Sequence, residues 1–248
     1  MNSINNLAAQ TYDTDKTGNK MGRDQNSLIT GYILAAGRSS RLPKQHKGLQ
    51  LLRQKPLIAH VIERFAPQVN HLYINSHVAD YAQFDYPLLA DQNGLFNGPL
   101  NGLLSCMQHA LKHHPNIEWL AITPCDAPFL PSDMVSQLAN AQTSAMARCY
   151  ATQETLQPTF SLWNVQLLNT LTEAVSKQQL GGFKAFIHLL QQQDDRLFYP
   201  LDWPVEESSQ SINPSLPAFF NINTPADLLE AENRLIQHEQ GKLNANKA

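Results

Sequence analysis

YILAAGRSSRLPKQHK, residues 32–47, joins an apolar run to a loop that is rich in small and basic residues. An apolar run that stops at a glycine is typical of a buried strand that ends in a loop. From residue 29 onward, further apolar runs alternate with helical patterns, which favours a mostly parallel sheet covered by helices on both faces. The sequence therefore predicts one three-layer α/β domain.

The same alternation predicts where the elements lie. Strands are expected at 31–35, 71–75, 87–90, 119–123, 145–150 and 159–163, and helices at 57–65, 99–112, 131–141, 165–177, 183–192 and 225–237. The last helix has a readable start, because Thr224 can cap it, Pro225 suits its first turn, and Asp227 completes an S/T-x-x-D/E pattern. Residues 201–217, which contain two Pro-initiated turn signals, are expected to form a long surface loop.

The bulk composition excludes several classes of protein. Lys and Arg number 18 against 21 Asp and Glu, and the net charge of -3 argues against the basic surface of a nucleic-acid-binding protein. No apolar stretch approaches the roughly 20 residues that cross a bilayer, and the polar first residues lack the apolar segment of a secretory signal, so we expect no membrane association and a cytoplasmic protein. We expect a disordered polar extension at 1–28, one domain at 29–238 and a polar tail at 239–248.

The loop after the first strand has two interpretations. Small residues at Ala35, Ala36 and Gly37 let backbone N–H groups approach a phosphate, and Arg41 and Lys47 are among the cations that could neutralise it. The pattern is neither the dinucleotide-binding G-x-G-x-x-G nor the P-loop G-x-x-x-x-G-K-[ST]. From the residues alone, a solvated basic turn stays open as the alternative.

Polar residues also end three later apolar runs. Asp126 follows the run LAITPC, Asn75 ends another run, and Asp91 follows a third. Because the carboxyl ends of parallel strands meet at one edge of a sheet, these side chains and Gly37 predict a convergent polar site. Asp126 could hold Mg²⁺ against phosphate oxygens there, or it could cap the following turn. Pro99 begins a helix whose N-terminus can face an anion.

The cysteines, histidines and large aromatic residues indicate no other centre. The three cysteines lie far apart and are expected to be reduced, with Cys125 a buried thiol rather than a nucleophile. His109 and His113 lie four apart on a predicted helix, but no Glu completes H-E-x-x-H, so we favour a solvated helix end over a metal site. Three aromatic residues are expected to pack rather than to stack on a cofactor: Trp203, Phe219 and Phe220.

Taken together, the motifs resemble those of the molybdenum cofactor nucleotidyltransferases, most closely the molybdopterin guanylyltransferases. The resemblance covers residues 29–237 and rests on LAAGRSSR (34–41), KGL (47–49), KPL (55–57), Asn75, Asp91, GPLNG (98–102), PCDAP (124–128), QPT (157–159) and NINTP (221–225). Many nucleotidyltransferases share the first of these motifs, whereas GPLNG, PCDAP and NINTP in this order are more specific. The resemblance implies a Rossmann-like fold of the nucleotide-diphospho-sugar transferase type.

The resemblance also implies a reaction, in which GMP passes from Mg-GTP to the terminal phosphate of molybdopterin and pyrophosphate is released. The implied GTP-binding residues are Leu34, Ala35, Ala36, Gly37, Lys47, Asn75, Asp91 and Asp126. The implied catalytic residues are Arg41, Lys47 and Asp126, with Mg²⁺ on Asp126, and the implied molybdopterin-binding residues are Asn221 and Asn223. Because the phosphate of molybdopterin is already a nucleophile, no covalent enzyme intermediate is needed. Other cofactor-biosynthesis proteins and the acceptor oxidoreductase are the implied protein partners.

The first loop departs from the pattern that it resembles. The guanylyltransferases usually carry Leu-Ala-Gly-Gly, then Arg-Met-Gly and Asp-Lys, whereas this chain has Ala36, Leu42-Pro43-Lys44 and His46. Ala36 is similar to the residue in the sister cytidylyltransferases, but Leu34 and the GPLNG stretch are similar to the guanylyl branch, so we favour GTP over CTP. Two alternatives stay open: a cytidylyltransferase of the same cofactor, and a non-catalytic protein that binds and delivers finished cofactor.

Overall fold

The computed structural model describes residues 29–36, 46–91, 98–152, 155–177, 180–203 and 218–245, except for the side chains of 238, 239 and 241–245. The expected extension at 1–28 and most of the expected loop at 201–217 lie outside these ranges. Within the described chain, no helix combines the length and the apolar character that a membrane span requires.

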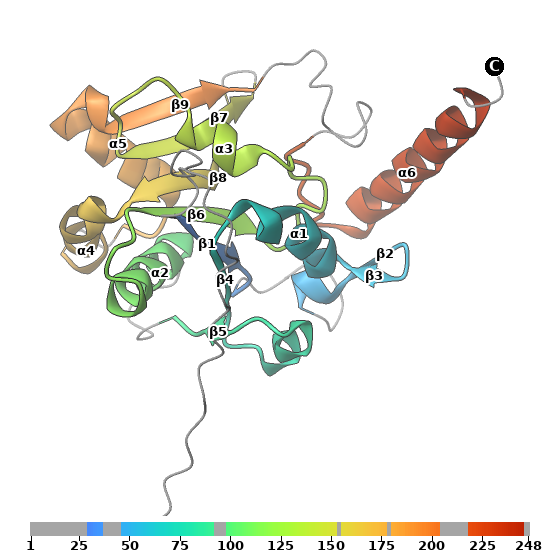
Figure 1. The fold of residues 1–248 in the computed structure, drawn as a ribbon, viewed down its shortest axis with the longest axis horizontal. Coiled ribbons are helices and arrows are strands. Elements are labelled where there is room, and N and C mark those ends of the chain that lie inside the picture. The colour runs from blue at the N-terminus through green and yellow to red at the C-terminus, as the bar shows by residue number, and fades with distance from the viewer. Residues whose placement is uncertain are drawn as a thin grey trace, which may run out of the picture.

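A seven-stranded sheet lies at the centre of the molecule (Figure 1). Its order is β5-β4-β1-β6-β8-β7-β9. The bounds are β1 (Ile29–Leu34), β4 (His71–Asn75), β5 (Leu88–Leu89), β6 (Trp119–Pro124), β7 (Ala147–Thr152), β8 (Thr155–Asn164) and β9 (Phe198–Asp202). Neighbours from β5 to β6 pair in parallel, β8 is antiparallel to both β6 and β7, and β7 pairs in parallel with β9. Only β8 runs against the other strands of this sheet, so the prediction of a mostly parallel sheet is confirmed.

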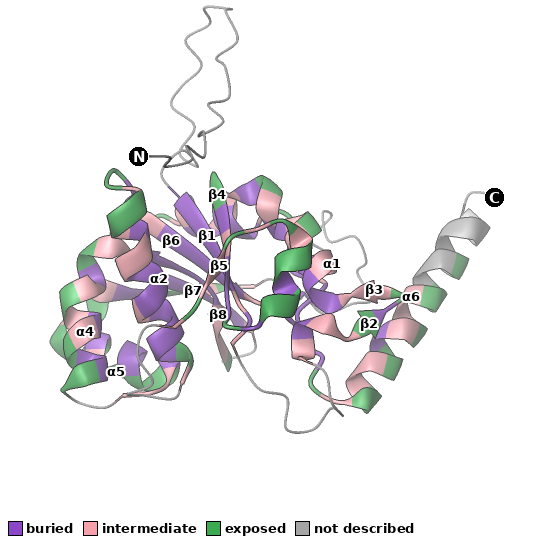
Figure 2. Cartoon of the chain, turned by 90° about the horizontal axis from the view of Figure 1, so that it is seen from below, coloured by how far each residue is buried: buried purple, intermediate pink, exposed green. Residues whose placement is uncertain are grey.

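Helices cover both faces of the sheet, which confirms the three-layer α/β prediction. One face is covered by α2 (Pro99–His113), α4 (Leu168–Ser176) and α5 (Phe183–Gln193), which share a core with Trp163 of β8. The other face is covered by α1 (Leu57–Phe65) and α3 (Met134–Ala139), which share a core with Ile33 of β1. Figure 2 shows that the buried residues follow the strands between the two helical layers.

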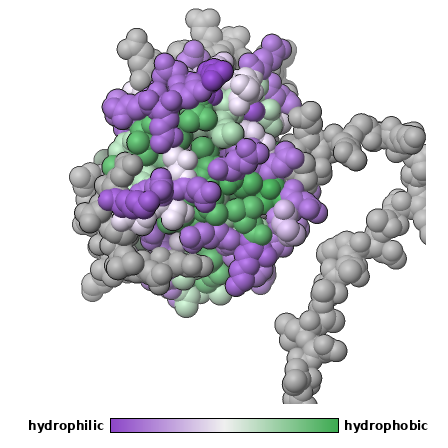
Figure 3. All heavy atoms as spheres, turned by 90° about the vertical axis from the view of Figure 1, so that its left-hand side faces the viewer, coloured by the Kyte–Doolittle hydropathy of each residue, from purple (hydrophilic) through white to green (hydrophobic). Residues whose placement is uncertain are grey.

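The surface above α4 and α5 is mixed in polarity. Figure 3 views the molecule from the side where these helices lie in Figure 1, and hydrophobic groups are visible there between hydrophilic side chains.

Four large hydrophobic side chains are the most exposed in the described chain: Leu51, Tyr199, Leu229 and Ile236. Two of the four belong to α6 (Pro225–Ala245), which projects from the body of the molecule (Figure 1).

The start of α6 is as predicted, but its end is not. The Asp227 N–H donates to Thr224 Oγ1 over 3.2 Å, and the Thr224 N–H donates to Asp227 Oδ2 over 2.8 Å. Together these two bonds form a capping box. The helix continues to Ala245, beyond the expected end at residue 237. Its first half packs through Ala231 into a small third core with the hairpin formed by β2 (Leu51–Leu52) and β3 (Lys55–Pro56).

Other differences from the predicted elements have tertiary causes. The strand expected at 159–163 is longer, because β8 pairs with β6 on one side and with β7 on the other. The helix expected at 165–177 begins as the short 3-10 turn Val165–Leu167. Strand β9 was not predicted, and it overlaps the first residues of the expected loop because it pairs with the sheet edge at β7. The bounds of β4 and α1 agree with the predictions.

Candidate active site

The ends of β1, β4 and β6 lie side by side at the carboxyl edge of the sheet. Leu34 is in register with Asn75 on one side and with Pro124 on the other. Beyond the strands, the Ala35 N–H donates to the Asn75 carbonyl oxygen over 2.9 Å, and the Cys125 N–H donates to the Leu34 carbonyl oxygen over 3.2 Å. These bonds carry the strand register into the loops, so the residues that follow each strand start from fixed positions.

Only part of the first loop is described. Ala35 is buried and Ala36 is half-buried at the head of the loop, whereas Gly37 and Arg41 lie outside the described residues. The roles expected of Gly37 and Arg41 therefore stay predictions.

Asn75 and Asp91 form a hydrogen-bonded pair at this edge. Asn75 Nδ2 donates to Asp91 Oδ1 over 2.7 Å and to the Leu89 carbonyl oxygen over 3.1 Å. The head of α2 packs against the pair, since a Cβ on Gly102 would lie 2.8 Å from Asn75 Oδ1. Real Cβ contacts are not this short, so the second glycine of GPLNG is required where α2 approaches Asn75. The structure thus brings three separate motifs together.

Asp126 and Lys47 form an ion pair next to these strand ends. Asp126 follows β6 and is only 3% exposed, while Lys47 begins the short 3-10 turn Lys47–Leu49. Burial raises the pKa of the Asp126 carboxyl, and the nearby ammonium of Lys47 opposes this rise. The arrangement places one carboxylate and one cation where the sequence predicted a phosphate and metal site.

The loop before α6 reaches the same ion pair. Lys47 Nζ also donates to Asn223 Oδ1, and the Ile222 N–H donates to the Asp126 carbonyl oxygen over 2.9 Å. Asn221 Oδ1 is buried and has no hydrogen-bond partner in the described part of the chain. The family resemblance implied that Asn221 and Asn223 bind molybdopterin, but nothing in the sequence predicted that Lys47 would contact both Asn223 and Asp126.

The residues fit a metal ion that arrives with a phosphate ligand. No group of three or more His, Cys, Asp and Glu side chains that could hold an ion occurs among the described residues. Mg²⁺ commonly takes one or two carboxylates together with substrate oxygens and water, so Asp126 alone can serve as the protein ligand. In the structure Lys47 neutralises this carboxylate, and a metal-bound phosphate ligand would offer oxygens to Lys47 and a cation to Asp126.

Cys125 packs beneath the site as a thiol. It is 5% exposed, and burial together with the neighbouring Asp126 raises its pKa to about 12. A thiol with this pKa is protonated at neutral pH and is a poor nucleophile. A Cβ on Gly48 would lie 3.2 Å from Cys125 Sγ and 2.9 Å from the Tyr81 hydroxyl oxygen, so the turn after Lys47 also depends on a glycine for close packing.

The histidines at the end of α2 form a solvated helix end only in part, because His113 is exposed as expected whereas His109 and His114 are half-buried. His109 Nδ1 lies 2.9 Å from the Tyr32 hydroxyl oxygen, and His114 Nε2 lies 2.8 Å from the Tyr73 hydroxyl oxygen. The rings of His71 and His114 stack with centroids 4.1 Å apart. The cause is topological, because α2 starts at the carboxyl edge and runs back over β1 and β4 to the opposite edge.

The aromatic residues near the end of the chain pack in the core, as predicted. The ring centroids of Trp203 and Phe219 are 5.2 Å apart, and that of Phe219 lies 4.8 Å from that of Phe160. Both contacts are T-shaped, with interplanar angles of 81° and 64°, and Trp203 and Phe219 are partly buried against the core that contains Phe160.

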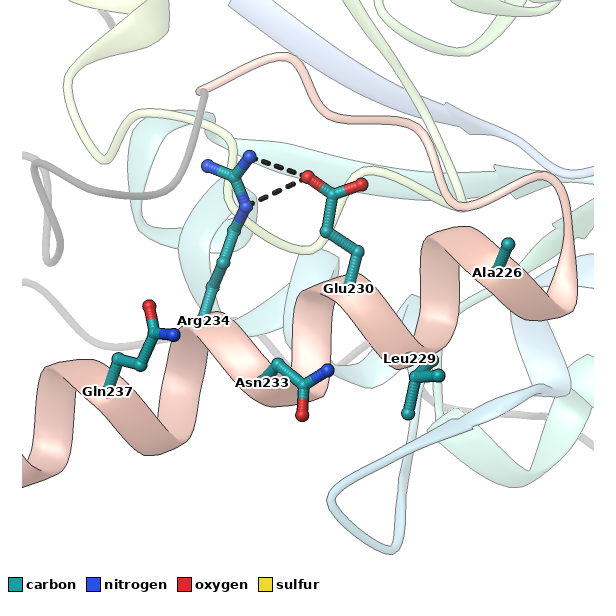
Figure 4. Close-up of a pocket in the computed structure, with 6 residues that line it drawn as sticks. All are labelled: Ala226, Leu229, Glu230, Asn233, Arg234 and Gln237. Atoms are coloured by element: carbon teal, nitrogen blue, oxygen red, sulfur yellow. Dashed lines mark hydrogen bonds and ion pairs between the residues drawn. The ribbon is translucent and has the colours of Figure 1, made fainter.

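A shallow hollow of about 490 Å³ runs along α6, away from the residues described above. Figure 4 shows that Glu230 and Arg234 point toward one another on one side of the helix, and Arg234 Nε donates to Glu230 Oε1 over 2.9 Å. The hollow is lined by Ala226, Leu229, Glu230, Asn233, Arg234 and Gln237. It contains none of the predicted site residues, so we place the candidate active site at the carboxyl edge.

Comparison with known proteins relates the chain to one family. The model of the MobA-like NTP transferase domain matches residues 31–196. Two curated relatives, from Yersinia pestis (strain Pestoides F) and Yersinia pseudotuberculosis (serotype O:1b, strain IP 31758), are each named molybdenum cofactor guanylyltransferase. Each is 37% identical over 201 residues, which is 80% of this chain and 92% of the relative.

Solved structures share the fold. Molybdopterin-guanine dinucleotide biosynthesis protein A from Archaeoglobus fulgidus superposes with a TM-score of 0.62 at 20% identity, covering 84% of this chain and 99% of that protein. Rv0371C from Mycobacterium tuberculosis H37Rv, solved in complex with manganese, superposes with a TM-score of 0.57 at 15% identity, covering 84% and 98%. At these identities the likeness supports the fold alone, and it agrees with the expected nucleotide-diphospho-sugar transferase type.

Proposed function

The chain belongs to the MobA-like NTP transferase family, and from this membership we propose that it transfers GMP from Mg-GTP to the terminal phosphate of molybdopterin. The products are the guanine dinucleotide cofactor and pyrophosphate. The observation that carries the proposal is the double contact of Lys47, which bonds to Asp126 on the nucleotide side and to Asn223 on the acceptor side. A nucleotidyltransferase needs both substrates at one phosphorus atom, and this arrangement brings their expected ligands to one lysine.

The reaction needs alignment more than new chemical groups. An oxygen of the molybdopterin phosphate forms a bond to the α-phosphorus of GTP, the bond from that phosphorus to the bridging oxygen breaks, and the electron pair leaves with pyrophosphate. Negative charge on the three phosphate groups of GTP and on the acceptor phosphate must be neutralised as this happens. Cys125, a protonated thiol beneath the site, takes no part in a covalent step.

Each site residue has a role in this scheme. Asp126 would hold Mg²⁺, which when bound neutralises phosphate charge and orients the triphosphate. Lys47 exchanges its present partners for phosphate oxygens and stabilises the leaving pyrophosphate, with Arg41 as the second cation. The manganese in the structure of Rv0371C supports a divalent metal at a site on this fold.

Two pairs of polar residues are proposed to bind the two substrates, one pair for each. Asn75 and Asp91, bonded to each other and packed against the head of α2, are proposed to bind the nucleoside of GTP. Asn221 and Asn223 are proposed to bind molybdopterin, and the buried Oδ1 of Asn221, which has no partner among the described residues, supports this role because it can accept a hydrogen bond from a donor on the pterin. We place the reaction in the cytoplasm, with the acceptor oxidoreductase as the recipient of the product.

Pyrophosphate release tests the proposal against the binding-protein alternative. Purified protein is incubated with GTP, molybdopterin and Mg²⁺, and pyrophosphate is measured while each component is omitted in turn. We expect release only when all three are present, because the acceptor phosphate is the nucleophile. Stable binding of the finished cofactor with no magnesium-dependent pyrophosphate release would instead establish a delivery protein.

A further inference from the structure

The carboxylate of Asp227 makes one bond that its helix does not need. In the capping box at the head of α6, Asp227 Oδ2 accepts from the N–H of the cap residue Thr224. The same oxygen accepts from the Asn223 N–H, also over 2.8 Å. Asn223 precedes the cap residue and lies outside the helix, whereas the reciprocal bonds of a capping box involve only the cap residue and the residue three positions later. The additional bond therefore fixes the loop rather than the helix.

This bond acts on the part of the loop that reaches the active site. The backbone held by Asp227 carries the Asn223 side chain, whose Oδ1 accepts from Lys47 Nζ. One residue earlier, the Ile222 N–H donates to the carbonyl oxygen of Asp126 over 2.9 Å. The loop is thus fastened at two consecutive residues, by Asp227 on the helix side and by Asp126 on the sheet side.

Asp227 is held as a carboxylate in this position. Burial favours its neutral form, but the N–H groups of Asn223 and Thr224 and the positive charge of Lys47 outweigh that effect and lower its pKa. A carboxylate that accepts two backbone N–H bonds holds them more strongly than a neutral acceptor would. Asp227 therefore holds the backbone at Asn223, beside the bonds that Lys47 makes to the Asn223 side chain and Ile222 makes to Asp126.

We propose that Asp227 is a positioning residue for the acceptor substrate, acting through Asn223. The inference rests on the proposed function and extends it to a residue that does not itself touch substrate. Asp227 holds the Asn223 backbone, so that the loop presents its polar groups to molybdopterin in one arrangement, also when Lys47 leaves the Asn223 side chain for a phosphate. Loss of this support weakens acceptor binding selectively, because the nucleotide residues Asn75, at the end of β4, and Asp91, which follows β5, make no bond to Asp227 among the described residues.

The test compares Asp227→Ala with a matched cap substitution elsewhere. Asn164 accepts from the Gln166 N–H over 3.0 Å at the start of the segment that leads into α4, so Asn164→Ala removes a cap of the same kind away from the site. We expect Asp227→Ala to raise KM for molybdopterin about tenfold, equivalent to about 1.4 kcal/mol, while KM for GTP changes less than about twofold. Asn164→Ala should lower Tm by about as much as Asp227→Ala does, and it should leave the KM values for molybdopterin and for GTP unchanged.

Two more variants keep the test decisive. Asp227→Glu retains the commoner capping-box residue and should return KM for molybdopterin to within about threefold of wild type. If Asp227→Ala does not fold, Asp227→Asn keeps an acceptor oxygen without the charge and should show a smaller rise in the same KM. A variant that folds, loses the Asn223 bond and keeps the wild-type KM for molybdopterin would overturn the proposal, because Asp227 would then be a helix cap only.

Direct binding separates this inference from the proposed function. The affinity of the nucleotide-free protein for molybdopterin is measured for wild type and Asp227→Ala. Weaker binding to the variant supports the positioning role even if the wild-type protein forms no dinucleotide, a result that would refute the proposed function alone. Equal affinities, with product formed by the wild type, would overturn the positioning role alone.

Discussion

The two edges of the central sheet are formed by the same strands, yet they carry different chemistry. At the carboxyl edge, Lys47 joins Asp126 to Asn223, and Asn75 bonds to Asp91. At the opposite edge, where α2 ends, phenol and imidazole rings pack on one another. The side chains of this ring cluster are Tyr32, His71, Tyr73, His109, His113 and His114.

The contacts at the carboxyl edge and those in the ring cluster differ in whether a bound substrate could replace them. At the carboxyl edge, the ion pair is made by groups that we propose bind the metal and the phosphates of the nucleotide, so a substrate could take over its bonds. In the ring cluster, each contact joins two side chains that are not proposed to bind any substrate. We therefore expect substitutions at the carboxyl edge to change turnover or affinity more than stability, and substitutions in the ring cluster to do the reverse.

The largest effect is expected at Asp126. Asp126→Asn keeps the shape of the side chain and removes the charge that would hold the metal, so kcat should fall at least about 100-fold while Tm stays within about 3 °C. Initial rates at saturating Mg²⁺ and a thermal melt measure both. Asp194→Asn, which removes a carboxylate paired with Arg196 on the surface, is the matched control and should keep full turnover. An unchanged kcat for Asp126→Asn would remove the metal role.

Gly102→Ala should weaken the binding of GTP. The added methyl group would lie 2.8 Å from Asn75 Oδ1, so the Asn75–Asp91 pair must shift, and we expect KM for GTP to rise about tenfold. Gly182→Ala is the control, because a Cβ at that glycine meets no atom within 4 Å. If both variants keep the wild-type KM for GTP, the pair does not bind the nucleoside.

The two contacts of Lys47, with Asp126 and with Asn223, predict that GTP and molybdopterin bind cooperatively. Lys47 Nζ bonds to Asn223 Oδ1 in the structure, and a triphosphate that attracts Lys47 would make Asn223 available to the acceptor. A non-hydrolysable GTP analogue with Mg²⁺ should therefore raise the affinity for molybdopterin about fivefold, which is a modest coupling. Lys47→Met should abolish the coupling.

The control for this coupling is Lys55→Met, which removes a lysine paired with the exposed Glu63 and should leave the coupling intact. Titrations of molybdopterin with and without the analogue measure the effect. Equal affinities in the wild type under both conditions would show that Lys47 does not link the sites.

The smallest effect is expected in the ring cluster, as a pH dependence of stability. Burial, followed by the nearby His113, His114 and Lys112, lowers the pKa of His109 to about 4, while an unfolded histidine titrates near 6.5. The unfolded state thus binds more protons, so this contribution to stability is complete above pH 6.5 and is lost as the pH falls toward 4.

His109→Gln should therefore reduce the fall in Tm between pH 7.5 and pH 5 by about 3 °C. Comparing the fall rather than Tm itself removes the cost of losing the bond to Tyr32. His188→Gln on the exposed face of α5 is the control and should keep the wild-type pH dependence. If His109→Gln shows the same fall as wild type, His109 does not confer acid sensitivity.

The sequence predicted which residues end the strands at the carboxyl edge, but it did not predict the contact that links the first loop to the loop before α6. Asn75 and Asp126 end apolar runs, and parallel strands place such residues together, so local pattern and topology sufficed. The bond from Lys47 to Asn223 joins residues 176 positions apart, and no local periodicity reports such a contact. The ring cluster was missed for the same reason, since it depends on how far α2 runs back along the sheet.

Competition between nucleotides tests the central claim most directly. Purified protein is given Mg²⁺, molybdopterin and equal concentrations of GTP and CTP, and the dinucleotide product is identified by mass. We predict the guanine dinucleotide, because the chain is 37% identical to molybdenum cofactor guanylyltransferases over 80% of its length. A cytosine dinucleotide would contradict the account and would make Ala36, the residue similar to the cytidylyltransferases, the first to revert.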